Sequence, residues 1–292
     1  MERTAFSLNI KGRLFMLDTP CVMGILNATP DSFYSTSRAQ TEAEIAARTE
    51  QLRTEGADII DVGAYSTRPG ADPVTEQEER RRLGAALKVV RREWPEAVVS
   101  VDTFRADVAK ACVEEFGADI INDIGGGLFD SRMFCTIAAL RVPYILMHLR
   151  GTPATMHDVP QYADCATEVF RELAERLAEL QALGVCDVVL DPGFGFSKSL
   201  NDNYRLFAAL SEFRRLERPL LVGVSRKRMV WQPLGITPEQ ALPATTALHA
   251  LALQAGAHIL RVHDVREAVQ TVTLFQRIAQ SSLNLNTTAA GN

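Results

Sequence analysis

The chain has 292 residues, of which 47% are hydrophobic and 23% are charged, and its formal net charge is −5. This composition excludes a chain that is disordered throughout, and the length suits one large domain or two average ones. The mild negative charge and the absence of long Lys/Arg runs argue against a nucleic-acid partner. No run approaches the roughly 18 apolar residues of a membrane span.

The first 18 residues alternate polar and apolar side chains around Asn9-Ile10-Lys11-Gly12. This pattern predicts an N-terminal β-hairpin and lacks the apolar core of a signal peptide. The five cysteines contain no C-x-x-C pair, so they are expected to be reduced thiols. Together these features predict a cytoplasmic protein.

Four segments repeat one pattern, in which a helix closes on glycine and a short apolar run then ends on polar residues. They are EGADIIDVG (55–63), FGADIINDIG (116–125), LGVCDVVLDPG (183–193) and AGAHILRVHD (255–264). Glycine suits the left-handed position after a helix, and the apolar run suits a strand buried on both faces. A further apolar run precedes each segment, at 21–28, 97–103, 143–148 and 219–225. Eight strands are therefore predicted.

Amphipathic stretches between these strands predict helices at 42–55, 75–94, 106–116, 162–183, 201–213 and 238–255. Strict alternation of strands and helices predicts an α/β protein with a single (βα)₈ TIM barrel over residues 1–280, and the hairpin of residues 1–18 is expected to close its bottom. An open doubly wound sheet is the alternative, but the first strand is not followed by G-x-G-x-x-G. The small, polar tail 281–292 is predicted to be disordered.

Parallel strands of a barrel present their carboxyl ends at one mouth, so the polar residues at the strand ends are candidates for a common pocket. A single polar residue at such a position often only caps the next helix, but here every strand supplies one. The candidates are Asn27, Asp61, Asp102, Asn122, Asp123, His148, Asp191, Ser225, Arg226, Lys227, Arg261 and His263.

Two chemical demands explain the residue types in this set. Asp102, Asn122 and Asp191 offer donors and acceptors suited to a flat heterocycle rich in N–H groups. Asn27, Arg68, Lys227, Arg261 and His263 offer donors and cations suited to a phosphorylated leaving group. The sequence has no H-x-H after the first strand for a two-metal site and no G-x-S-x-G nucleophile elbow.

Several sequence blocks resemble those of the dihydropteroate synthases. They include MGILNATPDSF (23–33), STRPGA (66–71), DPGFGF (191–196), SRK (225–227) and RVHDV (261–265), and they follow the family's order over nearly the whole chain. The resemblance implies a barrel enzyme of folate biosynthesis that condenses 6-hydroxymethyl-7,8-dihydropterin pyrophosphate with p-aminobenzoate. It also implies a homodimer.

The resemblance assigns roles to individual residues of this chain. The pterin would contact Asp102, Asn122, Asp191, Lys227, Met147, Phe196 and Gly223. The pyrophosphate would contact Asn27, Arg68, Arg261 and His263, with Mg²⁺ bridging its oxygens and Asn27 as the protein ligand of the metal. The p-aminobenzoate would contact Thr67, Pro69, Phe194, Ser225 and Lys227. The residues expected to carry the chemistry are Lys227, Arg261, His263, Arg68 and Asp31.

Two loops depart from the family pattern. Many relatives read SFSDGG in the first loop, where this chain has Ser-Phe-Tyr-Ser-Thr-Ser at 32–37 and so lacks the carboxylate. Asp31 is the candidate substitute for it. Ala64-Tyr65 stands where many relatives have Gly-Glu, and Tyr65 carries no charge at neutral pH.

Two alternatives to a dihydropteroate synthase remain open. A methyltetrahydrofolate-corrinoid methyltransferase shares the barrel and the Asp, Asn, Asp pterin cluster, but it has no use for RVH, STRPGA or SRK. A catalytically idle paralogue that binds pterin is motivated by the altered first loop. Retention of Thr67, Arg68, Lys227, Arg261 and His263 argues against it.

Overall fold

Eight parallel strands form one sheet in the order β8-β7-β6-β5-β4-β3-β10-β9 in the computed structural model, which describes residues 4–28, 38–65, 74–152, 155 and 161–289. The amide of Leu190 donates to the carbonyl of Pro219 (2.9 Å), which joins β8 to β9 and closes the sheet into a barrel. The strands are β3 (Cys21–Asn27), β4 (Ile59–Gly63), β5 (Val98–Asp102), β6 (Ile120–Asp123), β7 (Tyr144–Met147), β8 (Val188–Asp191), β9 (Leu221–Val222) and β10 (Ile259–Val262).

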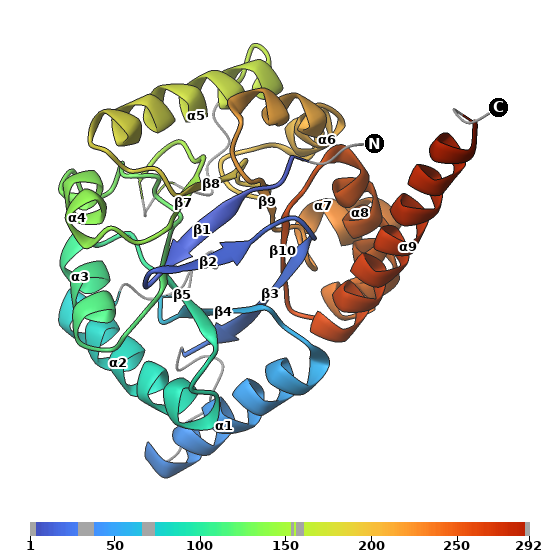
Figure 1. Cartoon of the computed structure of the whole chain (residues 1–292). Coiled ribbons are helices and arrows are strands. Elements are labelled where there is room, and N and C mark those ends of the chain that lie inside the picture. Colours follow the sequence, from blue (N-terminus) through green and yellow to red (C-terminus); the bar gives the residue numbers. More distant parts are fainter. Residues whose placement is uncertain (1–3, 29–37, 66–73, 153–154, 156–160, 290–292) are drawn as a thin grey trace.

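Helices follow the strands and form a ring around the barrel (Figure 1). They are α1 (Arg38–Glu55), α2 (Glu76–Glu93), α3 (Ala106–Glu114), α4 (Met133–Leu140), α5 (Cys165–Ala182), α6 (Leu200–Ala208), α7 (Arg228–Trp231), α8 (Leu242–Ala255) and α9 (Val265–Ala289). Helix α8 ends at Gly256, whose φ of +108° is the left-handed conformation predicted for such a glycine. The predicted (βα)₈ barrel is confirmed, and the open sheet is excluded.

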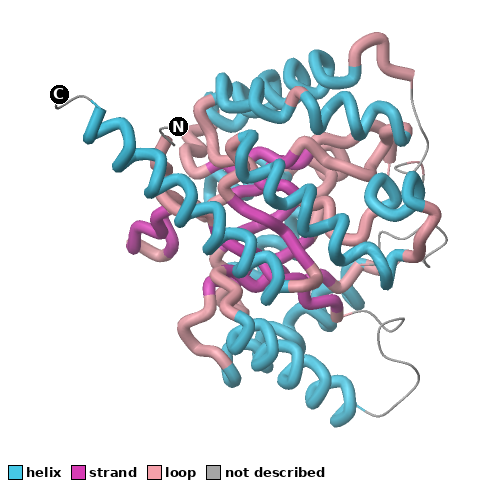
Figure 2. Tube along the Cα trace, turned by 90° about the vertical axis from the view of Figure 1, so that its right-hand side faces the viewer, coloured by secondary structure: helices cyan, strands magenta, loops and turns pink. Residues whose placement is uncertain are grey.

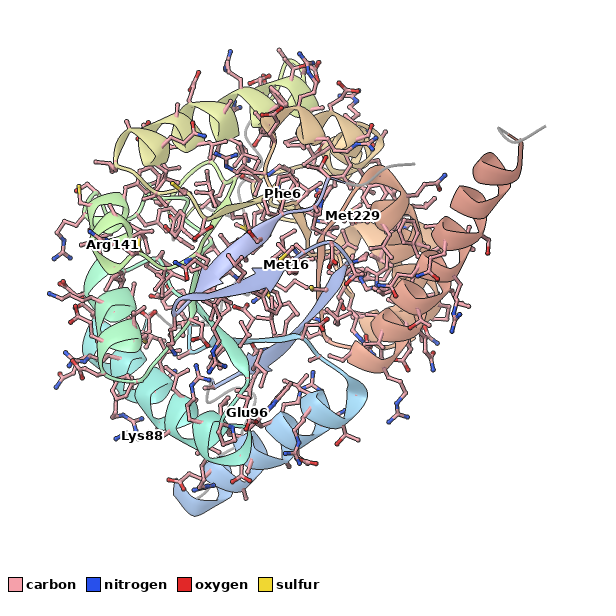
Figure 3. The ribbon with its side chains drawn as sticks, viewed as in Figure 1. Phe6, Met16, Lys88, Glu96, Arg141 and Met229 are labelled. Carbon is pink, nitrogen blue, oxygen red and sulfur yellow. The ribbon has the colours of Figure 1, made fainter. Side chains whose placement is uncertain are left out.

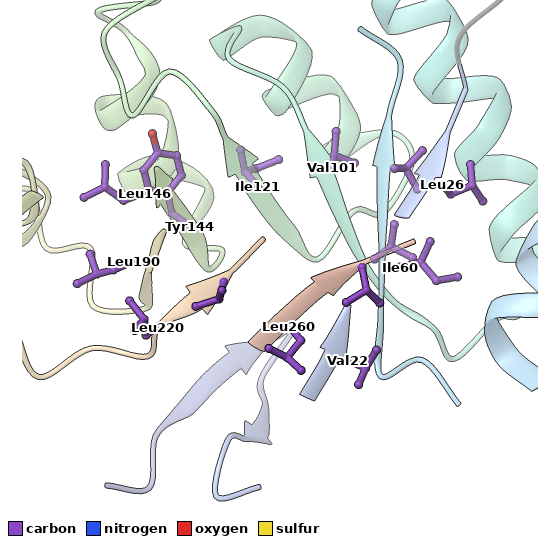
Figure 4. Packing of buried hydrophobic residues seen from close by; sticks show 14 of the residues in the cluster. Val22, Leu26, Ile60, Val101, Ile121, Tyr144, Leu146, Leu190, Leu220 and Leu260 are labelled. Carbon is purple, nitrogen blue, oxygen red and sulfur yellow. The ribbon is translucent and has the colours of Figure 1, made fainter. Parts of the chain in front are cut away.

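Alternate residues of each strand point to opposite sides of the barrel wall. Outward residues such as Val22, Ile60 and Val101 form the main core with the helices, and Figure 4 shows this layer. Inward residues near the strand starts, such as Met23 and Ile59, form a second cluster inside the barrel. This alternation fixes which strand-end side chains reach the interior of the mouth.

The hairpin of β1 (Ser7–Ile10) and β2 (Arg13–Met16) closes the bottom of the barrel. Leu8 and Ile10 belong to the inner cluster formed by the first residues of the barrel strands. The hairpin crosses the barrel in Figure 1 and lies at one end of it in Figure 2, and Met16 lies near the centre of the view in Figure 3. The predicted hairpin and its position are therefore confirmed.

The C-terminal helix is the longest of the described helices. Helix α9 runs to Ala289 and extends beyond the rest of the molecule, so the backbone of residues 281–289 is helical (Figure 2). Lengthening a helix that already exists requires no new nucleus, which is why a polar sequence can continue it. No helix among the described residues is long and apolar enough to cross a membrane.

Candidate active site

The inward residues at the carboxyl ends of the strands form a polar cluster at the mouth of the barrel. Strand alternation places Asp61 two residues after the inward Ile59, and it places Asn122 two residues after the inward Ile120. The same rule brings together Asn27, Asp102, Met147, Asp191, Gly223, Ser225, Arg261 and His263 from all eight strands. The predicted convergence on one mouth is thereby realised.

Arg261 is the centre of this cluster. Its Nε donates to Oδ2 of Asp61 (2.7 Å), and its Nη2 donates to Oδ2 of Asp102 (3.0 Å). Asn122 Nδ2 also donates to Oδ2 of Asp61 (3.1 Å). The side chain of Asp61 is fully buried, whereas that of Arg261 is 22% exposed. Asp61 therefore orients one residue predicted for the pterin and one predicted for the pyrophosphate.

Asp61 was recognised from the sequence only as a polar strand end and was given no binding role. Its Oδ1 is buried and has no hydrogen-bond partner among the residues that the structure describes. The sequence signal that could have revealed this role is strand alternation. Asp61 stands two residues after the inward Ile59, so its side chain faces the inside of the barrel. A partner such as Arg261, two strands away in the sheet and 200 residues away in sequence, left no local trace.

Burial and the concentration of carboxylates shift the ionisation of this cluster. Burial raises the pKa of Asp102, and the charge of Asp61 adds to this effect while Arg261 opposes it. Burial also raises the pKa of Asp191, which the charge of Lys227 opposes. Buried carboxyl groups with perturbed pKa values are typical of functional sites.

Lys227 follows β9, which lies next to β10, the strand that carries Arg261. Its Nζ donates to the carbonyl of Phe194 and lies 4.9 Å from the centre of the Phe196 ring. Burial lowers its pKa to about 8, with Asp191 opposing this shift. A Cβ at Gly223 would stand 3.9 Å from Lys227 Nζ and 3.8 Å from Cβ of Arg261, so this glycine leaves open space between two cations.

His263 is held by Ser225. The backbone amide of His263 donates to Ser225 Oγ (3.2 Å), and this hydroxyl lies 3.1 Å from His263 Nδ1. The hydroxyl keeps a second lone pair beside the one that accepts from that amide, so it can donate to Nδ1 or accept from an Nδ1–H, and the contact orients the ring in either tautomer. Desolvation at the mouth and the charge of Arg261 lower the pKa of His263 to about 4. The ring is therefore neutral near pH 7.

The neighbouring ion pair of Arg226 and Asp264 joins the loops that carry Lys227 and His263. Arg226 donates two hydrogen bonds to the carboxylate of Asp264, at 2.8 and 2.7 Å. Arg226 has a φ of +55°, a conformation that non-glycine residues rarely adopt. The bidentate pair compensates for this strained turn and fixes the SRK and RVHDV segments relative to each other.

Three expectations about side-chain placement need correction. Phe194 is fully buried in the outer core against Phe207, so its carbonyl, not its ring, faces the site. Asp123 points outward and accepts from the Tyr144 hydroxyl at 2.6 Å. His148 also points outward, toward Glu172 of α5. Asp123 and His148 each follow an inward strand residue directly, so the alternation of strands turns them away from the barrel, whereas Phe194 lies in the turn after β8.

Tyr65, one of the two departures from the family pattern, packs in an aromatic group at the mouth. Its ring lies 5.2 Å from that of Phe104 in an edge-to-face arrangement, and the guanidinium of Arg105 lies 5.6 Å from its centre. Arg105 also pairs with the buried Glu79. Tyr65 thus contacts the Arg105 cation through its aromatic ring, at the position where many relatives have the carboxylate of a Glu.

Several predicted site residues lie outside the described residues. These are Asp31, Thr67, Arg68 and Pro69, together with Tyr34 and Ser35 of the altered first loop. Asn27 ends β3, and a Cβ at Gly63 would stand 3.8 Å from Asn27 Oδ1. The described part of the chain has no group of three or more His, Cys, Asp or Glu residues that could hold a metal.

Comparison with known proteins agrees with the geometry. Residues 23–263 match the family described as pterin binding enzyme. The chain is 39% identical over 276 residues to the dihydropteroate synthase of Escherichia coli (strain K12), covering 94% of this chain and 95% of that protein.

Solved structures agree as well. The Xanthomonas albilineans dihydropteroate synthase with 4-aminobenzoic acid has a TM-score of 0.86 at 40% identity, covering 94% of this chain and 99% of the other. The enzyme of the same organism in complex with 7,8-dihydropteroate has a TM-score of 0.83 at 37% identity, with the same coverage.

A closed (βα)₈ barrel with acidic, amide and basic side chains gathered at its mouth defines an enzyme that binds a polar heterocycle. The chain belongs to the pterin-binding enzymes and, within them, to the dihydropteroate synthases.

Proposed function

We propose that the chain condenses 6-hydroxymethyl-7,8-dihydropterin pyrophosphate with p-aminobenzoate to give 7,8-dihydropteroate and pyrophosphate, and is therefore a transferase of folate biosynthesis. The single observation that carries this proposal is the cluster of Asp102, Asn122 and Asp61 on Arg261, facing Lys227 and Asp191 across one mouth. It combines groups for a heterocycle with cations for a leaving group. The relatives described above share this activity by name.

In this reaction the carbon–oxygen bond of the pterin methylene breaks, and its electron pair leaves with the pyrophosphate. The arylamine nitrogen then bonds to the methylene carbon and loses a proton. Asp102, Asn122 and Asp191 hold the pterin, with Met147, Phe196 and Gly223 shaping its slot, so that the reacting carbon is fixed while positive charge develops on it. Arg261 and His263 stabilise the leaving group, together with Arg68.

The p-aminobenzoate is proposed to bind near the rim, by Thr67, Pro69, Ser225 and Lys227. Lys227 lies between the Phe196 ring and the open space at Gly223, where it can reach both substrates. Phe196 takes the aromatic contact that was first assigned to Phe194, because only the Phe196 ring lies on the side of Lys227. Asp31 remains the candidate carboxylate of the first loop.

Mg²⁺ is proposed as the cofactor, with Asn27 as its protein ligand. Mg²⁺ is commonly held by one or two protein oxygens together with substrate phosphates, so a mouth without a cage of acidic ligands among its described residues fits this cation. When bound, it would neutralise charge on the pyrophosphate oxygens. The side-chain amide oxygen of Asn27, at the end of β3, is suited to it.

We also propose that the chain forms a homodimer through the neighbouring helices α8 and α9. Leu251 of α8 is 52% exposed, and Leu274 and Ile278 of α9 are 66% and 67% exposed. Exposed large apolar residues on adjacent helices mark an association surface. Light scattering should show that Leu274→Glu shifts the protein toward the monomer, whereas Leu183→Glu on the distant α5 end does not. Equal behaviour of the two variants would contradict this interface.

The test of the proposed function is the release of pyrophosphate when the protein, Mg²⁺, pterin pyrophosphate and p-aminobenzoate are mixed. One dihydropteroate should form for each pyrophosphate released, and omission of p-aminobenzoate should suppress the formation of dihydropteroate. Pterin binding without turnover would support the idle paralogue instead. Methyl transfer from methyltetrahydrofolate to a cobalamin protein would support the methyltransferase.

A further inference from the structure

The turn between β8 and α6 is built around a buried lysine that the reaction scheme does not use. Lys198 is only 6% exposed. Its Nζ donates to the carbonyls of Gly193 (3.0 Å) and Phe196 (3.2 Å) and lies 3.0 Å from Nδ1 of His148. One ammonium group therefore joins two loops of the barrel mouth, the one after β7 and the one after β8.

The backbone of this turn directs the carbonyls of Gly193 and Phe196 toward the Lys198 ammonium. Gly193, Gly195 and Ser197 have φ values of +71°, +80° and +45°. A Cβ at Gly193 would stand 2.0 Å from the carbonyl oxygen of His148, so the two loops are in direct backbone contact. Such an arrangement gathers several carbonyl oxygens around one point, which a cation stabilises.

Lys198 is also the first member of a chain of hydrogen-bonded side chains that leads to α5. Because an ammonium only donates, His148 Nδ1 accepts from it, and His148 Nε2–H then donates to Glu172 (2.9 Å). Glu172 in turn pairs with Arg150, whose guanidinium lies 4.1 Å from the centre of the Tyr162 ring. The position of Lys198 is thus fixed from the outer side of the barrel.

The other face of the same turn belongs to the site. The amide of Gly193 donates to Oδ1 of Asp191 (2.8 Å). The carbonyl of Phe194 accepts from Lys227, and the Phe196 ring lies against the same ammonium. Displacement of the turn would therefore move the partners of Lys227 and one oxygen of Asp191 together.

A buried cation at this point carries a desolvation cost. Burial lowers the pKa of Lys198 to about 7, which reflects the cost of removing the charge from water. Its hydrogen bonds to Gly193, Phe196 and His148 offset that cost, and an apolar side chain would leave these acceptors without this donor. The ammonium provides directed hydrogen bonds that an apolar side chain lacks.

We propose that Lys198 is a positioning residue for the reaction, whose ammonium holds the β8–α6 turn in the geometry that places Lys227 against Phe194 and Phe196. This inference rests on the proposed function. It adds a residue that touches no substrate yet sets the position of one that does.

The test compares Lys198→Met with Lys110→Met, a matched change at an exposed lysine of α3. Lys198→Met should fold and should lower kcat by about 10- to 100-fold, as expected for a reacting group displaced by a fraction of an ångström to an ångström. Its Kd for bare 6-hydroxymethylpterin should rise by a smaller factor than kcat falls, because Asp191, Phe196 and Lys227 adjoin the turn whereas Asp102 and Asn122 lie on other strands. Lys110→Met should match the wild type in both measurements.

Lys198→Arg is the second variant, because it keeps the cation and adds bulk in a site with no spare room. It should fold, and its turnover should fall by a larger factor than its affinity for bare pterin. Wild-type kcat in either folded Lys198 variant, or a loss of pterin affinity as large as the loss of kcat, would overturn the inference while leaving the proposed function intact. Absence of pyrophosphate release by the wild type would instead reject the proposed function, and this inference with it.

Discussion

Removal of the Asp61 carboxylate should disable the site from a position that the sequence marks only as a polar strand end. Asp61→Ala leaves Asn122 without this acceptor and leaves Arg261 with Asp102 as its remaining carboxylate. Deleting one partner of a fully buried pair costs about 3 to 5 kcal/mol, and the retained Asp102 reduces this to roughly 2 to 3 kcal/mol of unfolding free energy. A lost hydrogen bond to a charged group is worth about 1.5 to 3 kcal/mol, which corresponds to about 10- to 100-fold in kcat/KM.

The measurements are urea unfolding and steady-state pyrophosphate release. Asp61→Asn should be milder than Asp61→Ala, because an amide oxygen can take the place of Oδ2 and keep both donors satisfied. The matched control is Asp119→Ala, which removes a buried carboxylate paired with Lys11 and Arg91 at the bottom of the barrel. This control should lose stability but keep kcat/KM. Wild-type kcat/KM in Asp61→Ala, or an equal loss in Asp119→Ala, would refute the reasoning.

Three further results are expected. Lys227→Met should fold and lose more than about 100-fold in kcat, because one ammonium serves both substrates; ordinary turnover, measured by pyrophosphate release, would contradict that role. His263→Ala should weaken binding of pterin pyrophosphate more than binding of bare pterin, and calorimetry showing equal losses would exclude a contact with the leaving group. Burial lowers the pKa of His249 from 6.5 to about 4, so the unfolded chain binds this proton first on acidification and stability is lost as pH falls from 6.5 toward 4. In urea unfolding, the free energy of unfolding should fall by about 2 kcal/mol less between pH 7 and pH 5 in His249→Leu than in the wild type. The same pH dependence in both proteins would show that His249 is not the source of the loss.

The sequence determined the architecture because its signals are local and repeat. Four apolar runs follow a helix that closes on glycine, and four further apolar runs lie between them. These eight predicted strands alternate with helices, which is the pattern of a closed parallel barrel. The hairpin was equally readable from its alternation around Lys11-Gly12. The continuation of α9 into the polar tail depends on the turns before it and not on the tail's own composition.

The tertiary structure decided which strand-end residues act together. Asn122 and Asp123 are adjacent and both polar, yet one contacts Asp61 inside the barrel and the other contacts Tyr144 outside it. Strand phase settles this difference, and the phase of a short apolar run is visible only once its neighbours are in register. Phe194 lies in the turn after β8, where strand alternation does not apply, and its ring packs in the outer core against Phe207.

The sequence by itself therefore determined the set of residues that could meet at the mouth, since parallel strands direct their carboxyl ends to one side. Only the tertiary structure decided the pairings: Asp61 with Arg261, Ser225 with His263, and Lys198 with the loop after β7. These contacts join positions between 38 and 200 residues apart. Hydrogen bonds require atoms within about 3 Å, and that closeness is set by the closure of the barrel and not by any local pattern.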